Sequence, residues 1–193
     1  FAGAVGAFAA KFVAEKLLKP REALLLVARV YTSRQEDDRA EPLIERAKAL
    51  AEESGSLTAR AHAHMQSGEL YGWRRRDEEA LEEYERAREL FAEVGAATHL
   101  AKAMLRIAST VRRAGDLEKA EKRAREGIRI LKPLEDRGTL CEVQRFLAEV
   151  LLDQGRLDEA ELYALKAVET VGPQDVSSQA STKTSLALVR ATQ

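Results

Sequence analysis

Residues 108–120 read ASTVRRAGDLEKA and residues 148–160 read AEVLLDQGRLDEA, so one pattern with a small residue at each end recurs 40 positions later. The same two small positions occur in four successive units, at Ala28 and Ala40, Gly68 and Ala80, Ala108 and Ala120, and Ala148 and Ala160. A third small residue follows seven positions after the second, at Ala47, Ala87, Gly127 and Ala167. Small residues at fixed places indicate backbones in close contact. A period of this length is the signature of a solenoid, in which each unit buries its apolar face on its neighbours.

Each unit contains two amphipathic segments with a turn between them. In the third unit Met104, Ile107, Ala108 and Val111 have the spacing of one helical face. A breaker follows in comparable places, at Arg76-Asp77, Gly115-Asp116 and Gly155-Arg156. Glycine accepts the left-handed conformation that ends a helix, and aspartate can cap the next helix. The pattern predicts helices over residues 2–16, 21–33, 38–53, 57–74, 77–94, 97–113, 117–133, 138–153, 157–171 and 176–192.

The predicted fold is therefore all-α, with four helix pairs and one flanking helix at each end. Pro42 predicts a bend or a late start in the helix over 38–53, because proline lacks the amide that a helix interior needs. We expect one continuous array over residues 1–193. Its units cover residues 21–60, 61–100, 101–140 and 141–179, with partial units over 1–20 and 180–193. Both ends resemble cuts through a longer array, and their uncapped apolar faces predict that the chain can self-associate.

Composition narrows the function classes further. The formal net charge of −1 gives no global attraction to nucleic acid or anionic lipid. No apolar run reaches the roughly 18 residues of a membrane helix, so no membrane partner is expected. The lone Cys141 rules out an intrachain disulfide and a cysteine zinc cluster. A location in the reducing cytoplasm is the prediction.

The repeated slots resemble the tetratricopeptide repeat. The resemblance rests on the small residues at these spacings, on Tyr31, Tyr71, Val111 and Leu151 three positions after the first of them, and on the turns Gly-Asp-Leu-Glu-Lys-Ala and Gly-Arg-Leu-Asp-Glu-Ala. The usual unit of that family has about 34 residues, and this chain has the long-unit variety of about 40. The resemblance implies a right-handed α-α superhelix whose concave wall, built mostly from first helices, binds an extended or helical peptide.

A second resemblance is weaker and concerns residues 147–187. Their sequence is similar to repeat arrays that follow an ATPase module in large bacterial signalling proteins, some of which carry a nucleotide cyclase domain. This resemblance implies that the chain is part of a larger bacterial signalling protein.

No constellation for catalysis or for a cofactor is evident in the sequence. Neither a phosphate-binding loop nor a dinucleotide fingerprint is found among the 11 glycines. His62 and His64 lie two positions apart on a helix, so they diverge and are expected to pack or to face solvent. Cys141 opens a helix without an evident base partner, so it is expected to be a small buried residue. We expect a protein that is not an enzyme and needs neither cofactor nor metal.

The expected function is that of an interaction scaffold or regulatory module that binds a protein or peptide segment, including another domain of the same polypeptide. Residues 101–140 carry a net charge of +5 (11 basic, 6 acidic), and in their first helix Lys102, Arg106, Ser109 and Arg113 form one stripe. Lys102 and Arg106 resemble the basic pair with which chaperone-binding family members hold a peptide carboxylate. The predicted groove residues are Arg29, Gln66, Glu69, Trp73, Lys102, Arg106, Ser109, Arg113, Arg145 and Glu149.

Nucleic-acid binding through the basic third unit is the alternative function. Lys119, Lys122, Arg123 and Arg129 would add a second basic helix to the stripe. The near-zero net charge and the low aromatic content argue against this alternative, because single-stranded nucleic acid is commonly bound by base stacking on aromatic rings.

Overall fold

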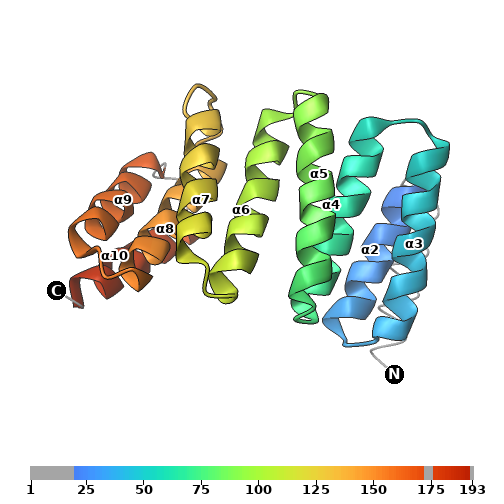
Figure 1. The fold of residues 1–193 in the computed structure, drawn as a ribbon, viewed down its shortest axis with the longest axis horizontal. Helices are drawn as coiled ribbons and strands as arrows, with labels where there is room; N and C mark the ends of the chain where they lie inside the picture. The colour runs from blue at the N-terminus through green and yellow to red at the C-terminus, as the bar shows by residue number, and fades with distance from the viewer. Residues whose placement is uncertain (1–19, 172–175, 192–193) are drawn as a thin grey trace. The chain divides into compact units, whose positions relative to one another are not determined.

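A computed structural model describes residues 20–171 and 176–191 of the chain, and every regular element in these ranges is an α-helix. Figure 1 shows their order along the chain. The helices are α2 (Pro20–Ser33), α3 (Asp37–Glu53), α4 (Leu57–Trp73), α5 (Asp77–Glu93), α6 (Ala97–Arg113), α7 (Leu117–Leu131), α8 (Arg137–Asp153), α9 (Leu157–Thr170) and α10 (Val176–Ala191). Each bound lies within two residues of the predicted one. The predicted helix over 2–16 lies outside the described residues.

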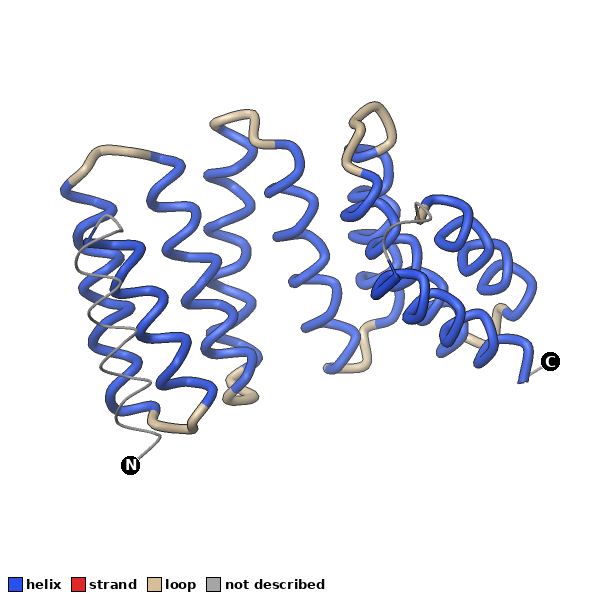
Figure 2. Tube along the Cα trace, turned by 180° about the vertical axis from the view of Figure 1, so that it is seen from behind, coloured by secondary structure: helices blue, strands red, loops and turns tan. Residues whose placement is uncertain are grey.

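The chain divides into two compact units, one ending at Val94 and the other beginning at Gly95. In the described part of the first unit α2 pairs with α3 and α4 with α5, and in the second unit α6 pairs with α7 and α8 with α9. Helix α10 packs against α9 and α8. Short loops join consecutive helices from α2 to α5 and from α6 to α9 (Figure 2). The expected all-α arrangement of stacked helix pairs is confirmed, while the single unbroken array stays a prediction.

The periodic small residues lie where the helices pack most closely. Ala40, Ala80, Ala120 and Ala160 all have 0% of their surface exposed. The residues of the other two small positions are buried as well, from Ala28 to Ala167. Larger side chains fill the space between the helices, among them Phe91, Leu131 and Leu147. The repeated small residues therefore mark the positions where two helices are too close together for a larger side chain.

A left-handed residue recurs in the turns every 20 positions from Gln35 to Gly115, and again 40 positions later at Gly155. Positive φ occurs at Gln35 (60°), Gly55 (64°), Arg75 (61°), Gly95 (69°), Gly115 (90°) and Gly155 (75°). In the repeat over residues 61–100, the left-handed residue between the two helices is Arg75. It lies directly before Arg76-Asp77, where the sequence predicts the break between the helices. Glycine is favoured at such a position because it has no Cβ to clash with the backbone. Gln35 and Arg75 hold the conformation at a cost that glycine avoids.

Replacing Arg75 with glycine is expected to stabilise the chain by about 0.5–1 kcal/mol, because relief of the left-handed strain exceeds the added flexibility of the unfolded chain. Arg75 is exposed, so few packing contacts are lost. Thermal unfolding of Arg75→Gly measures the gain, and Gly115→Ala on the equivalent turn is expected to lower the melting temperature. A drop in melting temperature for Arg75→Gly would contradict the strain argument.

Two local features of the helices were anticipated only in part. Asp116 caps α7 as expected, because its Oδ1 accepts a hydrogen bond from the Lys119 amide at 2.9 Å. Helix α3 begins at Asp37 with Pro42 inside it, so the late start is wrong, while the alternative of a bend at Pro42 stays a prediction. The first turn is already closed upstream by Ala40 N donating to Glu36 O at 3.2 Å, and Pro42 is exposed. One missing hydrogen bond on the solvent side costs less than the packing that an uninterrupted helix gains.

Candidate functional site

The first helices of the second unit surround a cavity of about 450 Å³. We call the surface formed by α6, α8 and α10 the first-helix face. The cavity is wide enough for several side chains of a partner, and it lies open on one side. Its lining combines two cations, two carboxylates and small polar groups, from Lys102, Asp136, Gly138, Thr139, Cys141, Glu142, Arg145, Ser181 and Thr182.

The carboxylate of Asp136 stands at one end of this cavity, where it caps α8. Its Oδ1 accepts a hydrogen bond from the Thr139 amide at 3.0 Å. That hydrogen bond lowers the pKa of Asp136, burial partly opposes the effect, and Thr98 and the Lys102 ammonium lower the pKa further. Asp136 is thus held ionised, and it offsets part of the positive charge of Lys102 inside the cavity.

Arg145 and Glu149, both predicted to contact a partner, are hydrogen-bonded to each other along α8. Glu149 also accepts from Arg112 Nη1 at 2.9 Å, and Arg112 Nε donates to Asp153 Oδ2 at 2.6 Å. Arg145 is one of the predicted groove residues, and its charge is largely neutralised by Glu149. Arg112, which is not among the predicted groove residues, ties α6 to α8.

The basic stripe of α6 is present on one side of that helix. Lys102, Arg106 and Arg113 are exposed and Ser109 is half-buried. Of these four predicted residues only Lys102 lines the cavity. Lys102 is therefore the cation best placed to meet a bound segment in this unit.

The four predicted residues of the first unit meet at one small pocket between α2 and α4. Arg29, Gln66, Glu69 and Trp73 line it together with apolar side chains, and its volume is about 20 Å³. Gln66 Nε2 donates to Glu69 Oε2 at 3.2 Å, and 58% of the surface of Trp73 is exposed. Such a volume holds about one water molecule. The pocket can act only as a surface contact.

Two of the three arginines that follow Trp73 form ion pairs within the chain, and the third, Arg75, is exposed. Arg74 Nη1 donates to Glu41 Oε2 at 3.2 Å and Arg76 Nε donates to Glu79 Oε1 at 2.9 Å. The guanidinium of Arg76 also lies 4.6 Å from the ring centre of Tyr71. The segment is thus a helix end braced by ion pairs, rather than a cluster arranged to grip an anion.

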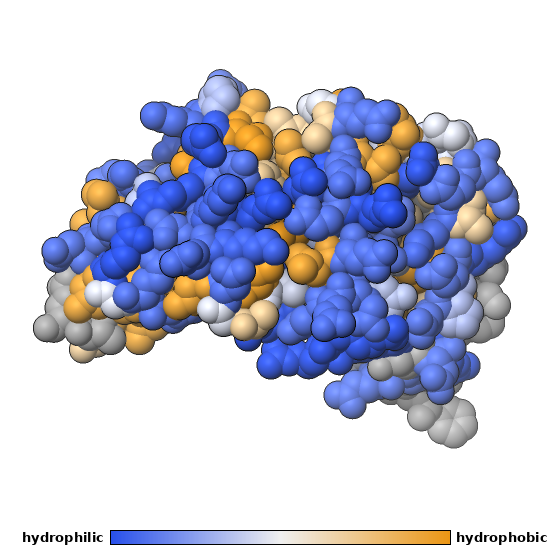
Figure 3. Space-filling model, in the orientation of Figure 1, coloured by the Kyte–Doolittle hydropathy of each residue, from blue (hydrophilic) through white to orange (hydrophobic). Residues whose placement is uncertain are grey.

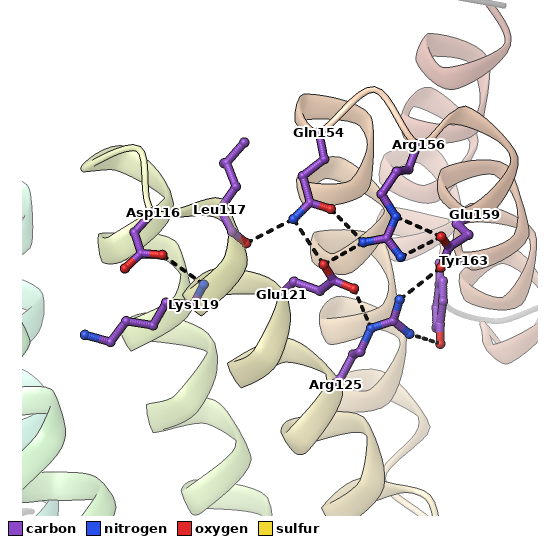
Figure 4. A network of polar contacts seen from close by, with 9 residues as sticks. All are labelled: Asp116, Leu117, Lys119, Glu121, Arg125, Gln154, Arg156, Glu159 and Tyr163. Atoms are coloured by element: carbon purple, nitrogen blue, oxygen red, sulfur yellow. Dashed lines mark hydrogen bonds and ion pairs between the residues drawn. The ribbon is translucent and has the colours of Figure 1, made fainter.

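The second unit contains a polar network similar to the ion pairs of Arg74 and Arg76, formed by residues 80 positions later in the sequence. Figure 4 shows Glu121 at its centre: Oε1 accepts from Arg125 Nε at 2.7 Å, and Oε2 accepts from Gln154 Nε2 at 3.0 Å and Arg156 Nη1 at 2.7 Å. Arg156 Nε also donates to Glu159 Oε1 at 2.8 Å. Glu121, Gln154, Arg156 and Glu159 correspond by number to Glu41, Arg74, Arg76 and Glu79. The network joins α7, the end of α8 and α9, and it has a structural role.

The Glu121 network makes stability depend on pH. Burial alone would raise the pKa of Glu121, but hydrogen bonds from Arg125 and Gln154 and the charge of Arg156 lower it overall. Because the folded-state pKa is below the unfolded one, the stabilisation is complete above the ordinary carboxyl value of about 4.3. It is lost as the pH falls through the lowered folded-state value.

We expect Glu121→Gln to lower the free energy of unfolding by about 1 kcal/mol at neutral pH, with the deficit shrinking as the pH falls below about 4. Urea titrations at several pH values measure the difference between the variant and the wild type. Glu118→Gln, on the exposed side of the same helix, is the matched control and is expected to change little. A deficit that is constant across the acidic range would contradict the assignment.

The histidines and the cysteine considered as candidate catalytic residues make contacts typical of structural residues. His64 Nδ1 lies 2.6 Å from Glu83 Oε2, and His62 packs edge-on against Phe91 with ring centres 5.2 Å apart. Cys141 is buried, with 3% of its surface exposed. Within residues 20–171 and 176–191 no group of three or more His, Cys, Asp or Glu residues is placed to hold a metal ion. In the same ranges no helix has the length and hydropathy to cross a membrane.

Comparisons with known proteins agree with this architecture. Residues 59–132 match the sequence profile of the tetratricopeptide repeat. A comparison with curated protein sequences gave no significant match. Among solved structures, BtubC (BKLC) from P. vanneervenii is 17% identical with a TM-score of 0.81, over 98% of this chain and 81% of that one.

Two further structures are similar over most of this chain. The apo form of RapI is 15% identical with a TM-score of 0.80, over 90% of this chain and 64% of RapI. The STAND protein PH0952 from Pyrococcus horikoshii, which has a tetratricopeptide repeat sensor, is 16% identical with a TM-score of 0.71, over 81% of this chain and 25% of that protein. This chain thus spans under two thirds of RapI and a quarter of the STAND protein. The paired helices and these structural matches show that the chain has the fold of tetratricopeptide-type repeat proteins, and residues 59–132 also match the profile of that family.

Proposed function

We propose that the chain is a protein-interaction module that binds an extended or helical segment of a partner on its first-helix face. The observation that carries the proposal is the cavity of about 450 Å³ formed by residues of α6, α8 and α10. Folds of stacked helix pairs are generally used as scaffolds that present such surfaces. Burial in the cavity would supply affinity, and the placed charges would supply specificity.

The charges of the lining favour a segment with an acidic group opposite Lys102. Arg145 is engaged with Glu149, and Asp136 and Glu142 add negative charge at the rim. A uniformly acidic segment would meet those carboxylates, whereas a segment with one well-placed acidic side chain or a terminal carboxylate would meet Lys102 alone. The stripe of Arg106 and Arg113 offers further cations along α6.

The comparisons support a regulatory setting for this module. The STAND protein from Pyrococcus horikoshii is a signal-transduction ATPase in which the repeats serve as a sensor. By analogy, we propose that this chain belongs to a larger bacterial signalling protein in the cytoplasm and that its partner includes another domain of the same polypeptide.

The test is a selection of binding peptides from a displayed random library, followed by affinity measurements on charge-reversed variants. Lys102→Glu/Arg106→Glu is expected to weaken the selected peptides by at least about tenfold. Lys119→Glu/Lys132→Glu reverses two exposed lysines that do not line the cavity and lie outside α6, α8 and α10, and it is the matched control. Peptides that bind the two variants equally well would remove the first-helix face from consideration.

Nucleic-acid binding through α7 is the alternative. Lys119, Lys122 and Arg129 are exposed on α7. Two other arginines of that helix are engaged with carboxylates, Arg123 with Glu126 at 3.3 Å and Arg125 with Glu121 and Glu159. The positive surface is thus smaller than the basic residue count of the third unit suggested. A mobility-shift titration without salt-sensitive binding would dispose of this alternative.

A further inference from the structure

The outer sides of the second helices differ in charge and polarity from one repeat to the next. The four outward positions of each second helix follow one stripe and correspond by the period of 40. They are Asp38, Pro42, Glu45 and Ala49 in α3; Glu78, Glu82, Glu85 and Glu89 in α5; Glu118, Lys122, Arg125 and Arg129 in α7; and Asp158, Leu162, Leu165 and Glu169 in α9. Helix α5 is wholly acidic along this stripe, α7 is mainly basic, and only α9 carries two leucines there.

The two leucines are exposed where the other helices hold mostly charged side chains. The exposed fraction is 48% for Leu162 and 37% for Leu165. Solubility alone favours charged residues at such positions, as the corresponding Lys122 and Arg125 of α7 illustrate. Leucines three positions apart on one helical face offer adjoining apolar surface to a partner.

A hollow of about 530 Å³ lies along the outer side of α7 and reaches Tyr163 of α9. It is lined by the α7 stripe and by Ile128 and Tyr163. Arg125 spans from α7 to α9, because its Nη1 donates to the Tyr163 hydroxyl at 2.9 Å and its Nη2 lies 3.1 Å from Glu159 Oε2. The Lys166 ammonium lies 4.6 Å from the centre of the Tyr163 ring, so that ring is held in place. The hollow is therefore built on fixed side chains.

The charge at the hollow is positive on balance. Glu121 and Arg125 both line it, and they neutralise each other. Of the remaining charged lining residues, Lys122 and Arg129 are basic and Glu118 is acidic, and all three are exposed. Figure 3 shows apolar residues between hydrophilic ones on the side of the molecule that it draws. Apolar surface bordered by cations fits a ligand that is apolar on one side and acidic at its edges.

We propose that the outer side of α7 and α9 is a second docking site, distinct from the first-helix face, for an amphipathic helix of a partner protein with acidic residues beside its apolar stripe. The outer patch consists of Lys122, Ile128, Arg129, Leu162, Tyr163 and Leu165. A helix laid along the hollow between two helices is a common mode of recognition, in which apolar side chains at i, i+3, i+4 and i+7 enter the groove. Lys122 and Arg129 lie seven positions apart, two turns of α7, so they would meet acidic residues at the same spacing.

The probe is a fluorescein-labelled synthetic helix of about 18 residues with leucines on one face and glutamates beside them. A peptide with lysines in place of the glutamates and a scrambled peptide are its controls. Fluorescence anisotropy with the full chain is expected to show binding of the glutamate peptide at least about tenfold tighter than that of either control.

Two variants assign the binding to the outer patch. Leu162→Glu/Leu165→Glu places charges where α7 already carries them, so the fold is expected to be retained, and it should weaken the glutamate peptide by at least about tenfold. Lys122→Glu/Arg129→Glu should reverse the preference between the glutamate and lysine peptides. Leu188→Glu changes an exposed leucine of α10 outside the patch and should leave binding unchanged.

Four results would overturn the proposal. Equal binding of the glutamate and scrambled peptides is the first, and unchanged binding by Leu162→Glu/Leu165→Glu is the second. The third is a chain that binds a labelled oligonucleotide but not the peptide, and loses that binding in Lys122→Glu/Arg129→Glu. The patch would then bind nucleic acid. The fourth is self-association in sedimentation, without peptide binding, that Leu162→Glu/Leu165→Glu abolishes, since the occupant would then be a second copy.

Discussion

Replacing Ala80 with leucine is expected to lower the free energy of unfolding by about 2–3 kcal/mol, because a side chain forced into a closed packing position displaces its neighbours. Ala80 has 0% of its surface exposed and occupies the slot that defines the repeat. Leucine is as good a helix former as most residues, so the loss would come from packing rather than from helix propensity. Urea denaturation measures the change as a shift of the midpoint at constant slope.

Ala92→Leu is the matched control for this substitution. Ala92 lies in the same helix, α5, but is exposed, so leucine there meets solvent. The control should unfold within about 0.5 kcal/mol of the wild type. Equal midpoints for the two variants would show that the alanine period does not mark close packing.

Glycine-to-alanine substitutions at two buried small slots are expected to act in opposite directions. A Cβ at Gly68 would lie 2.6 Å from Cδ1 and Cε1 of the Tyr84 ring, which is itself 4% exposed. A Cβ at Gly127 would lie 3.5 Å from Val143 Cγ1, an ordinary contact. Gly68→Ala should destabilise by about 1–2 kcal/mol through the clash, whereas Gly127→Ala should stabilise by about 0.5–1 kcal/mol through helix propensity.

Thermal or urea unfolding of both variants checks the signs. The clash at Gly68 is tied to one ring, so Gly68→Ala/Tyr84→Leu should lose less stability than the sum of the two single substitutions. Stabilisation by Gly68→Ala would mean that the Tyr84 ring moves aside at little cost.

Much of the helical framework could be predicted from the sequence. The bounds of α6 agree with prediction at both ends. Helix α7 ends at Leu131, two residues early: Lys132 still has helical geometry, but Pro133 has no amide N–H to continue the hydrogen-bond pattern. Left-handed turns at Gly115 and Gly155 were equally predictable, since glycine marks them. The left-handed Gln35 and Arg75 were not predictable, because neither residue type signals that conformation and only the turn they share with the glycines imposes it.

The candidate sites could be predicted only in part. A helical stripe placed Lys102, Arg106 and Arg113 on one side of α6, and the structure keeps them exposed there. The pairing of Glu149 with Arg112 was not predictable, because Arg112 belongs to another helix 37 residues away. The pairing with Arg145 has the i, i+4 spacing of a helical ion pair, so the sequence did hold a signal for it. The sequence did hold a signal for the Glu121 network, because its residues lie 80 positions after Glu41, Arg74, Arg76 and Glu79. This signal recurs at twice the repeat period, so a comparison of neighbouring repeats does not reveal it.

The order of the residues was enough to establish which segments are helical, where they turn and which positions form the closed contacts, because periodicity, helix breakers and small side chains act over a few neighbouring positions. The folded chain was needed to learn which charges neutralise one another, that Gly68 faces the ring of Tyr84, and that Lys122, Arg129 and Tyr163 line one hollow. These contacts depend on which helices pack against each other within each unit. The spacing of residues along one helix does not determine which side chains of another helix they reach.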